Sequence, residues 1–495
     1  MDYALLGINA AVRGLASAQT ALNTMGHNVA NANTEGYSRQ RVNVSAAVPI
    51  PTPGFNTPTR LASLGSGTQI NGINRMRDEY LDLQVRRENA TLGANEAIAK
   101  NVVLIEDVFH EPSETGLASV MNEFFNSWHT LTSNPESPGV RAVVRDQAAA
   151  LANAFNDASQ RLTTQRRELD FQVRNALTDI NVFTKQIAQL NDQIAEVQVG
   201  GGSANQLLDQ RDLALEKMSK LIKVHTVQHE DGKVWVYMNG RALVAGNIQT
   251  DLGFQPSDEG AYSDVTFEGN VVPQAETGAA VGAMLQMRDD IIGRPRFRDA
   301  IPVLPDSPNG ILHRIDTLAN QLAQEVNALH RAGSLTDGTV SGKDFFVNMG
   351  DPLSSTMGAD KISVNPDIMD GTAGLAQIAT GGTPSSGPGD TVTSKLIAAL
   401  RNKATMSATA TFEDDYRNLL AGLGVMGQSA NRTVSNQGEV LNYLFQRKEE
   451  TSGVNMDEEM ADMVRYQHAY QASARALNAF DEILDRIING LGAGR

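Results

Sequence analysis

Near its C-terminal end the chain carries an apolar stripe at helical spacing, interrupted only by Gln467 and Asp481. Asn455 lies three residues before Glu458, the spacing of a capping box, and the acidic residues 457–459 suit the positive end of a helix dipole. The pattern therefore predicts one long amphipathic helix over residues 452–491. Its stripe consists of Met460, Met463, Gln467, Tyr470, Ala474, Leu477, Asp481, Leu484, Ile488 and Leu491.

The N-terminal end repeats this pattern over residues 1–30. Its stripe consists of Leu5, Ile8, Val12, Leu15, Gln19, Leu22, Gly26 and Val29. Two amphipathic helices of this kind can pair as a coiled coil, but one pair leaves much of its apolar flank in water. We therefore expect other copies of the chain to cover the flank, because contacts that do not close into a ring generate open helical assemblies.

Between the two ends, helical periodicity alternates with strand signals. Residues 28–40 are rich in Asn and Gly, which favours a turn into an extended segment, and residues 49–58 form a proline-rich connector. Helices are predicted over residues 76–109, 138–199, 205–222 and 311–331, then from Val392 to the C-terminal end with a glycine-rich interruption at residues 422–427. An unbroken helix over residues 138–199 would be about 90 Å long.

The strand signals cluster in the middle of the chain. Residues 224–230, 233–238 and 241–245 have strand character and are separated by Asp-Gly and Asn-Gly pairs, which predict a three-stranded meander. A further hairpin is predicted over residues 262–272, turning at Gly269 and Asn270. Residues 333–390 are expected to be irregular, with short extended pieces near Phe345 and Ile362.

Together these elements predict a mainly α fold with inserted β segments, in which the terminal helices pair as a coiled coil and a long helical rod carries small β insertions. The expected division has seven parts. They are the N-terminal half of the coiled coil with its connector (1–60), the helical rod in three parts (61–223, 278–332 and 391–451), a β meander (224–277), an irregular outer insertion (333–390) and the C-terminal half of the coiled coil (452–495).

Composition narrows the range of functions. The formal charge of −16 and the pI near 5.0 argue against nucleic acid and anionic membranes as partners, since both require clustered Lys and Arg. Cysteine is absent, which excludes disulfides and thiolate chemistry. We see no cleavable signal at the N-terminus and no stretch long enough to cross a membrane, so export without a cleaved signal is the expected alternative to a cytoplasmic location.

Candidate chemistry is sparse. Residues 422–427 spell G-x-G-x-x-G, but they follow a helical segment instead of a strand, which argues against a dinucleotide site. His225 and His229 have the spacing of a metal pair on a helix, but in a strand that spacing spans about 13 Å. The acidic residues 457–459 are explained by helix capping, and Met460, Met463, Tyr466 and Tyr470 by packing. We therefore expect no catalytic, cofactor or metal site.

Two short motifs resemble a known family. Residues 28–40, NVANANTEGYSRQ, and residues 452–475, SGVNMDEEMADMVRYQHAYQASAR, resemble the paired signature of bacterial flagellar axial proteins, and within them the hook-associated protein 1 family. LLDQRD at residues 207–212 and GKDFF at residues 342–346 are weaker landmarks. Glu35 departs from the family pattern, where proline is common.

The resemblance implies a structural role at the junction between flagellar hook and filament. Implied partners are further copies of the chain in a helical or ring-shaped layer, the hook protein, the second junction protein and an export chaperone on the C-terminal helix. Implied locations are the extracellular flagellum and, before assembly, the cytoplasm. The expected motif turn contains Asn31, Asn33, Gly36 and Tyr37. The expected assembly interface contains Leu5, Ile8, Val12, Leu15, Leu22, Val29, Met460, Met463, Tyr470, Leu477, Leu484, Ile488 and Leu491.

Two alternatives stay open at this stage. A hook or distal-rod subunit would share the terminal helices, and the YSRQ motif with the long heptad helix argues against it. A nucleotide- or metal-dependent enzyme would have to use the glycine run or the His225 and His229 pair.

Overall fold

The computed structural model describes residues 2–47, 50–51, 63–64, 66–109, 111, 113–229, 231–257, 260, 262–293, 310–351, 357–382, 387–407 and 409–492. The chain divides into two compact units. The first comprises Met1–Ala90, Asp179–Leu252 and Gln437–Arg495; the second comprises Thr91–Thr178 and Gly253–Asn436. The predicted proline-rich connector lies largely outside the described residues, as do the four prolines of residues 295–308.

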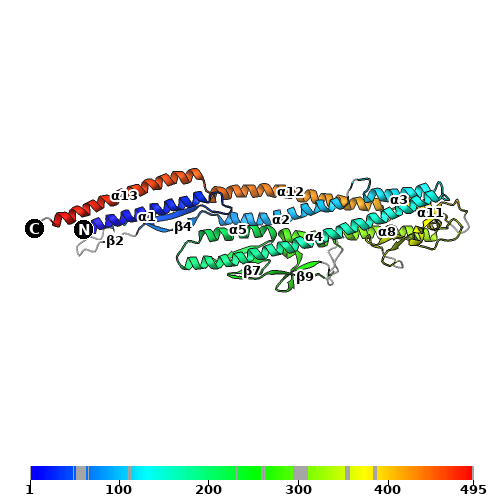
Figure 1. The fold of residues 1–495 in the computed structure, drawn as a ribbon, viewed down its shortest axis with the longest axis horizontal. Helices are drawn as coiled ribbons and strands as arrows, with labels where there is room; N and C mark the ends of the chain where they lie inside the picture. Colours follow the sequence, from blue (N-terminus) through cyan, green and yellow to red (C-terminus); the bar gives the residue numbers. More distant parts are fainter. Residues whose placement is uncertain are drawn as a thin grey trace. The chain divides into compact units, whose positions relative to one another are not determined.

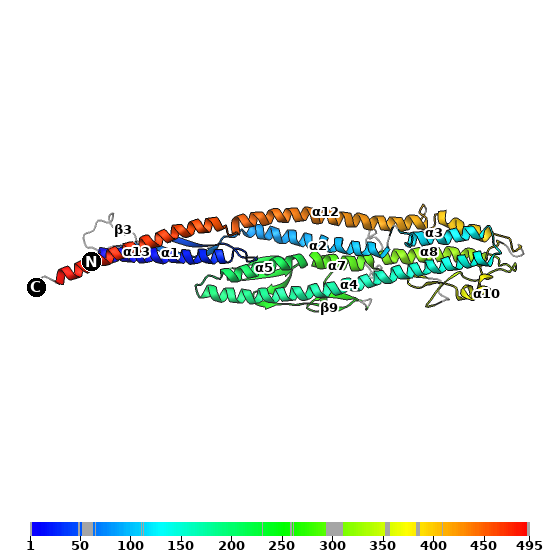
Figure 2. The ribbon, with the colours of Figure 1, turned by 45° about the horizontal axis from the view of Figure 1, so that its top comes forward.

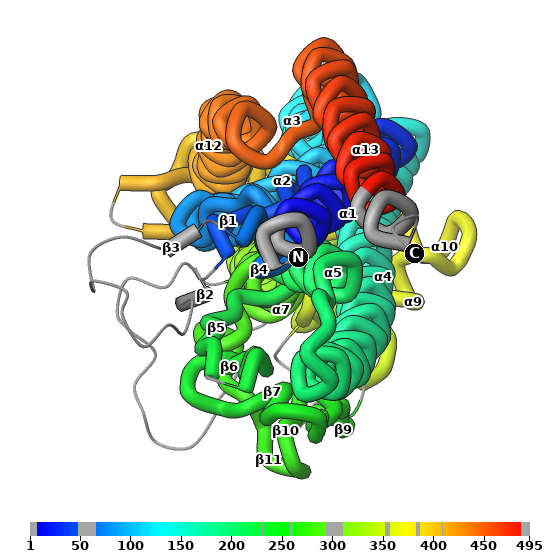
Figure 3. Tube along the Cα trace, turned by 90° about the vertical axis from the view of Figure 1, so that its left-hand side faces the viewer, coloured from blue at the N-terminus to red at the C-terminus, as the bar shows by residue number. Residues whose placement is uncertain are grey.

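The first unit is built on the two terminal helices. Helix α1 (Asp2–Ala30) and helix α13 (Met456–Gly492) lie side by side and run in opposite directions (Figures 1 and 2). Strands β1 (Gln40–Ala46) and β4 (Thr68–Arg75) form an antiparallel hairpin beside α1 (Figure 3), and the Ser17 and Thr68 hydroxyls are 3.0 Å apart. The two-residue strands β2 (Ile50–Pro51) and β3 (Ser63–Leu64) also pair. The predicted pairing of the terminal helices is confirmed.

The rest of the first unit packs a small sheet on two helices. The sheet contains β5 (His225–Gln228), β6 (Val234–Met238), β7 (Arg241–Ala245) and β8 (Ile248–Gln249) in that order. Asn191, on the C-terminal part of helix α4 (Pro138–Val199), is fully buried, and its amide donates to the carbonyl oxygens of Val234 and Gly246 at 2.8 and 2.7 Å. Helix α5 (Asn205–Leu221) follows α4. This amide fixes the sheet to the helix because its buried donors find backbone acceptors there.

Of the three predicted turns of the β region, one is confirmed and two need an adjustment. Asn239 and Gly240 have positive φ angles, as an Asn-Gly hairpin turn requires, whereas β5 and β6 are joined by the longer loop of residues 229–233. In the later hairpin of β10 (Ser263–Phe267) and β11 (Asn270–Val271), the turn lies at Glu268 and Gly269, one residue before the predicted position. The meander and the hairpin themselves are confirmed.

The second unit surrounds an aromatic core. Its helices are the greater part of α2 (Glu79–Phe109), α3 (Leu117–Leu131), α4 up to Thr178, α6 (Gln274–Thr277), α7 (Ala279–Gln286), α8 (Ile311–Ala332), α9 (Pro366–Met369), α10 (Gly371–Leu375), α11 (Val392–Ala399) and the first part of α12 (Phe412–Ser452). The π-helix η1 (Met287–Ile292) extends α7, and the 3-10 helix η2 (Leu400–Asn402) extends α11. Its strands are β9 (Leu252–Pro256, whose first residue belongs to the first unit), β10 and β11, and the hairpin of β12 (Phe346–Asn348) with β13 (Ile362–Val364). The predicted extended pieces near Phe345 and Ile362 are thus confirmed.

One predicted interruption is wrong. Helix α12 passes through Gly422, Gly424 and Gly427 without a break. A Cβ on Gly427 would lie 2.8 Å from Cγ1 of Val102, so glycine there allows α12 to approach α2 closely. The break lies earlier, between η2 and α12, which correspondingly begins at Phe412 instead of continuing from Val392.

Candidate functional site

The two ends of the chain meet in a group of polar side chains that we call the polar hub, of which Asn28 and Glu459 are buried and Glu458 is exposed: Asn28, Tyr37, Arg39, Gln40, Glu458 and Glu459. Arg39 donates from Nε to Glu459 at 2.7 Å and from Nη1 to Glu458 at 2.8 Å. Its backbone N–H also donates to the carbonyl oxygen of Ser452 at 2.8 Å. Two of these bonds tie the turn after α1 to the start of α13, and the third ties it to Ser452, the last residue of α12.

Asn28 is the centre of the polar hub. It is only 1% exposed, and its Nδ2 donates to the Glu459 carboxylate at 3.0 Å and to the Gln40 carbonyl at 2.9 Å. Its Oδ1 accepts from the Tyr37 hydroxyl at 2.7 Å and from the Gln40 N–H at 3.0 Å. Asn28 thus satisfies four hydrogen bonds, the full capacity of an amide side chain.

The polar hub is electrostatically balanced. Burial disfavours the charge on Arg39, but Glu458 and Glu459 outweigh it and raise the pKa of that guanidinium. Burial, with the negative charges of Asp209 and Glu459, raises the pKa of the Tyr37 hydroxyl. Tyr37 therefore stays neutral and acts as a hydrogen-bond donor, and the arrangement is suited to holding backbone in place.

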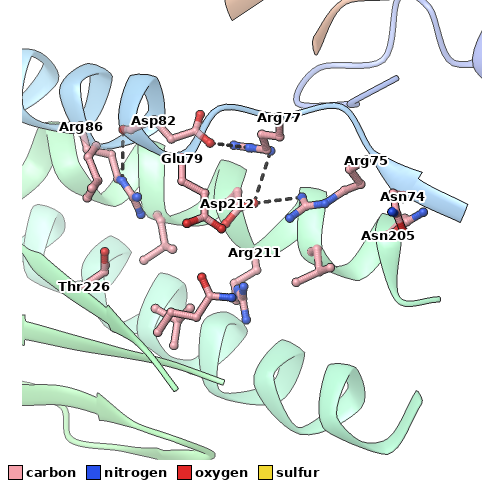
Figure 4. A pocket seen from close by; sticks show the side chains of 15 residues that line it. Asn74, Arg75, Arg77, Glu79, Asp82, Arg86, Asn205, Arg211, Asp212 and Thr226 are labelled. Atoms are coloured by element: carbon pink, nitrogen blue, oxygen red, sulfur yellow. Dashed lines mark hydrogen bonds and ion pairs between the residues drawn. The ribbon is translucent and has the colours of Figure 1, made fainter. Parts of the chain in front are cut away.

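A second group, the arginine–aspartate cluster, joins the end of β4 and the start of α2 to α5. Arg75 contacts Asp209 at 2.8 Å and Asp212 at 3.0 Å, and Arg77 pairs with Asp82. Burial acts to raise the pKa of Asp212, but Arg77, Arg75 and Arg211 outweigh it and hold that pKa below its usual value. Arg75, Arg77, Arg211, Asp82 and Asp212 lie together in Figure 4.

The backbone of Ser38 connects the two groups. Its N–H donates to the Asp209 carboxylate at 3.2 Å, and its hydroxyl accepts from Arg77 at 3.3 Å. Three motifs far apart in the sequence, in residues 28–40, 207–212 and 452–459, therefore converge on one turn. Their residues hold the terminal helices to the rest of the first unit.

The sequence alone did not identify this arrangement. Asn455 does cap α13, accepting from the N–H groups of Asp457 and Glu458 at 3.0 and 3.3 Å, as predicted. Capping does not, however, account for Glu458 and Glu459, whose carboxylates bind Arg39. One feature of the sequence could have indicated this contact. The single arginine of the YSRQ motif is complementary in charge to the acidic residues near the C-terminal end of the chain.

The predicted motif turn is present, and its residues have different roles. Gly36 has a φ of +81° and a Cβ there would lie 3.1 Å from Leu213, so glycine serves both the turn and a close contact. Asn31 donates to the His27 carbonyl at 2.9 Å, whereas Asn33 is exposed. Glu35, where the family pattern has proline, forms an ion pair with Lys217 at 2.9 Å.

The two terminal helices approach closely along a line of small residues. A Cβ on Gly7 would lie 2.5 Å from the ring of Phe480, and one on Gly14 would lie 3.0 Å from the Ser473 hydroxyl. Ala21 continues the heptad spacing and is 1% exposed. Small residues on α1 thus receive larger ones on α13, as in the knobs and holes of a coiled coil.

The residues of the predicted assembly interface are distributed over both flanks of this pair. Val12 and Met460 are 47% and 50% exposed. The side chains of Leu5, Ile488 and Leu491 lie outside the described residues. The remaining members are half-buried: Ile8, Leu15, Leu22, Val29, Met463, Tyr470, Leu477 and Leu484.

The sequence missed part of this exposed surface. Met456 and Val464, one helical turn on either side of Met460, are 45% and 50% exposed. Together the three form an apolar stripe on the first turns of α13, which we call the methionine–valine stripe. The heptad pattern passed over Met456 and Val464 because it begins at Met460 and continues through Met463 and Gln467.

The residues weighed for chemistry are accounted for structurally. The glycine run lies inside α12, and His229 stacks on Trp235 with ring centroids 4.8 Å apart. Within the part of the chain that the structure describes, no group of three or more His, Asp or Glu could hold a metal ion. None of the helices in that part is both long and apolar enough to cross a membrane.

Comparisons with known proteins agree on one family. Residues 103–346 match the model of the flagellar hook-associated protein FlgK helical domain. Residues 8–37 match the flagella basal body rod protein model, and residues 446–490 match the C-terminal model of the flagellar basal body rod FlgEFG proteins.

Proteins similar to this chain over almost their whole length are named flagellar hook-associated protein 1. The chain is 31% identical to flagellar hook-associated protein 1 of Bacillus subtilis (strain 168), with 100% of both chains covered. It is 26% identical to the Escherichia coli (strain K12) protein of that name, over 97% of this chain and 99% of that one. The fold resembles that of the flagellar hook junction protein FlgK from Burkholderia pseudomallei, with a TM-score of 0.60, 17% identity, and coverage of 74% and 99% of the two chains.

Proposed function

The chain belongs to the flagellar hook-associated protein 1 family and is a structural protein of the hook–filament junction, and we propose that its terminal helices are the surfaces through which it assembles. The observation that carries this proposal is the methionine–valine stripe. Three consecutive turns of α13 expose Met456, Met460 and Val464, each 45–50% accessible. Isolated exposed apolar residues are ordinary, but a contiguous helical stripe favours contact with another protein surface.

The half-buried residues have a complementary role in this proposal. Leu15, Leu22, Tyr470 and Leu477 are neither fully packed nor fully exposed in the single chain. A neighbouring copy would remove their remaining surface from water, at about 25 cal/mol for each Å² of apolar area buried. The polar hub holds both helices in register before this occurs, which lowers the entropic cost of association.

The family suggests the identity of the neighbours. We propose that they are further copies of the chain in a helical or ring-shaped layer, the hook protein on one side and the second junction protein on the other. We further propose that a chaperone covers α13 before export and that the assembled protein is extracellular. An exposed apolar stripe on a helix is the kind of surface that a groove-bearing chaperone can bind.

The absence of a catalytic role is part of the same proposal. Because the two carboxylates of the polar hub are joined to the guanidinium of Arg39, these charges serve to position backbone. The seven-part division of the chain also stays a prediction.

A substitution in the stripe tests the assembly surface. Val464→Asp places a charge in the proposed interface, so hooks in a strain that carries it should lack filaments, and the variant protein should appear in the medium. The purified variant should keep its unfolding midpoint, since exposed substitutions change the unfolding free energy by about 0.5 kcal/mol or less. The matched control is Val199→Asp, because Val199 is 92% exposed in the same unit but lies on α4.

Normal filaments on Val464→Asp hooks would overturn the proposal. If a strain lacking the protein had no hooks at all, the chain would instead act as a hook or distal-rod subunit. Electron microscopy of isolated hooks separates these results.

A further inference from the structure

A cavity of about 440 Å³ lies within the first unit, beside the arginine–aspartate cluster (Figure 4). It is bounded by the strand β4 and the first turns of α2, by α5, and by β5 and β6. Four arginines line it, namely Arg75, Arg77, Arg86 and Arg211, against the three carboxylates of Glu79, Asp82 and Asp212. Positive groups are thus concentrated there in a chain whose overall charge is −16.

The four arginines fall into two classes. Arg75 and Arg77 form ion pairs with Asp209, Asp212 and Asp82. Arg86 and Arg211 form no ion pair among the described residues. Arg86 donates from Nε to the Asp82 carbonyl at 3.3 Å, and Arg211 donates from Nη1 to the Gly232 carbonyl at 2.7 Å and to the Asn191 amide oxygen at 3.2 Å.

Arg211 is the most unusual of them. Its side chain is only 2% exposed, and its Nε is buried without a hydrogen-bond partner in the described part of the chain. A buried donor on a charged group destabilises the fold when no acceptor satisfies it. The cavity therefore contains a guanidinium whose bonding capacity is incomplete.

The surroundings of the cavity also disfavour the positive charges of Arg211 and Arg86, as an incomplete set of partners would. Burial lowers the pKa of Arg211 to about 10, against the attraction of Asp212, and the charges of Arg75, Arg86 and Arg77 lower it further. Burial also lowers the pKa of Arg86. Glu79 is exposed at the start of α2, so water screens its charge.

We propose that this cavity binds a small tetrahedral oxyanion of the phosphate or sulfate class between Arg86 and Arg211. A guanidinium presents its N–H donors in a planar fork that matches the oxygens of such an anion. Arg86 and Arg211 donate only to neutral carbonyl and amide oxygens, and Nε of Arg211 has no acceptor among the described residues. The anion would supply further acceptors to both guanidiniums. Because Arg86 and Arg211 form no ion pair among the described residues, their positive charges favour an anion over a cation, and the volume accommodates the anion together with several water molecules.

Binding would have a structural consequence. Arg86 lies on α2 and Arg211 on α5, and Arg211 also holds the loop before β6 through Gly232. An anion between them would join three elements of the first unit with charge-assisted hydrogen bonds. The site does not depend on the proposed assembly surface, since none of its residues lies on α1 or α13.

Phosphate titration of the purified full chain tests the site. At pH 7 and constant ionic strength maintained with chloride, phosphate should raise the thermal midpoint saturably, and sulfate should compete with it. Arg86→Gln should weaken binding at least about tenfold, as expected for the loss of a charge-assisted bond. Arg87→Gln is the matched control, because Arg87 is exposed on the same helix and does not line the cavity.

A direct measurement avoids dependence on stability. Phosphorus NMR line broadening should follow the same affinity order, and Arg211→Lys, which keeps the charge but not the fork, should weaken binding if it folds. A midpoint that does not saturate, an equal response in the Arg86 and Arg87 variants, or binding of acetate but not of phosphate would each overturn the proposal.

Discussion

The aromatic core of the second unit and the terminal helix pair of the first unit differ in how completely the single chain buries their apolar side chains. In the core, Phe124, Trp128, Phe345 and Phe346 are all 0% exposed, and their rings contact each other at centroid distances of 5.1–6.4 Å. In the helix pair, small residues line the contact and apolar residues remain accessible on the flanks. The core is buried within one chain, whereas the pair is held by close contacts of small residues and by the polar hub and leaves apolar side chains accessible on its flanks.

The largest expected effect is in the aromatic core. Trp128→Ala should lower the free energy of unfolding by about 3–5 kcal/mol, because a fully buried indole leaves a cavity when it is truncated. Urea denaturation followed by circular dichroism measures the change. Phe254→Ala is the control, since Phe254 is 53% exposed in the same unit. Equal losses in the two variants would contradict a self-sufficient core.

The polar hub should show the next largest effect. Glu459→Gln should cost about 2–3 kcal/mol, because the Glu459 side chain is 2% exposed and its charge is bound by Arg39 and Asn28. Amide exchange should accelerate at residues 28–40 and 452–460. Glu458→Gln is the control, since that side chain is 59% exposed and its ion pair should contribute about 1 kcal/mol or less. Equal acceleration in both would mean that capping, and not the buried charge, holds the hub.

Substitution on the line of close approach between α1 and α13 should change the free energy of unfolding less than substitution in the polar hub. Ala21→Leu should cost about 1–2 kcal/mol, since added methyl groups must displace α13 from a well-packed line. Ala16→Leu is the control, because Ala16 is exposed on the same helix. This substitution should leave the free energy of unfolding nearly unchanged. Exchange protection of α13 in the two variants distinguishes the faces, and equal protection would show that α13 does not pack on Ala21.

Acid should weaken the second unit through His330. Burial lowers the pKa of His330 below its ordinary value of 6.5, and the neutral ring bonds the Lys343 carbonyl at 2.9 Å and the Ala379 N–H at 3.1 Å. The unfolded chain therefore takes up the proton first. The stabilisation is complete above pH 6.5 and is lost as pH falls through the lower folded pKa.

Urea midpoints between pH 7.5 and 5 test this dependence. His330→Gln should flatten it, whereas His313→Gln, on the same helix, should leave it unchanged. An unaltered slope in His330→Gln would assign the acid sensitivity to other groups.

The hydrophobic periodicity of the sequence predicted the helices in which buried residues recur at regular spacing. Val173, Ile180, Ile187 and Ile194 are each at most 1% exposed along α4, as the heptad pattern required. The glycine run of α12 was misleading because it lies inside a helix, where Gly427 allows a close approach to Val102, a residue distant in sequence. The polar hub could not be derived from spacing, since the partners Asn28 and Glu459 belong to different ends of the chain.

The bond between Asn28 and Glu459 joins residues 431 positions apart. Closing a loop of that length costs about 5 kcal/mol of chain entropy, so folding of the first unit must await the C-terminal residues. A chain truncated before α13 would leave Arg39 and Asn28 without these acceptors. The hydrogen bonds that hold the turn after α1 therefore depend on residues from the opposite end of the same polypeptide.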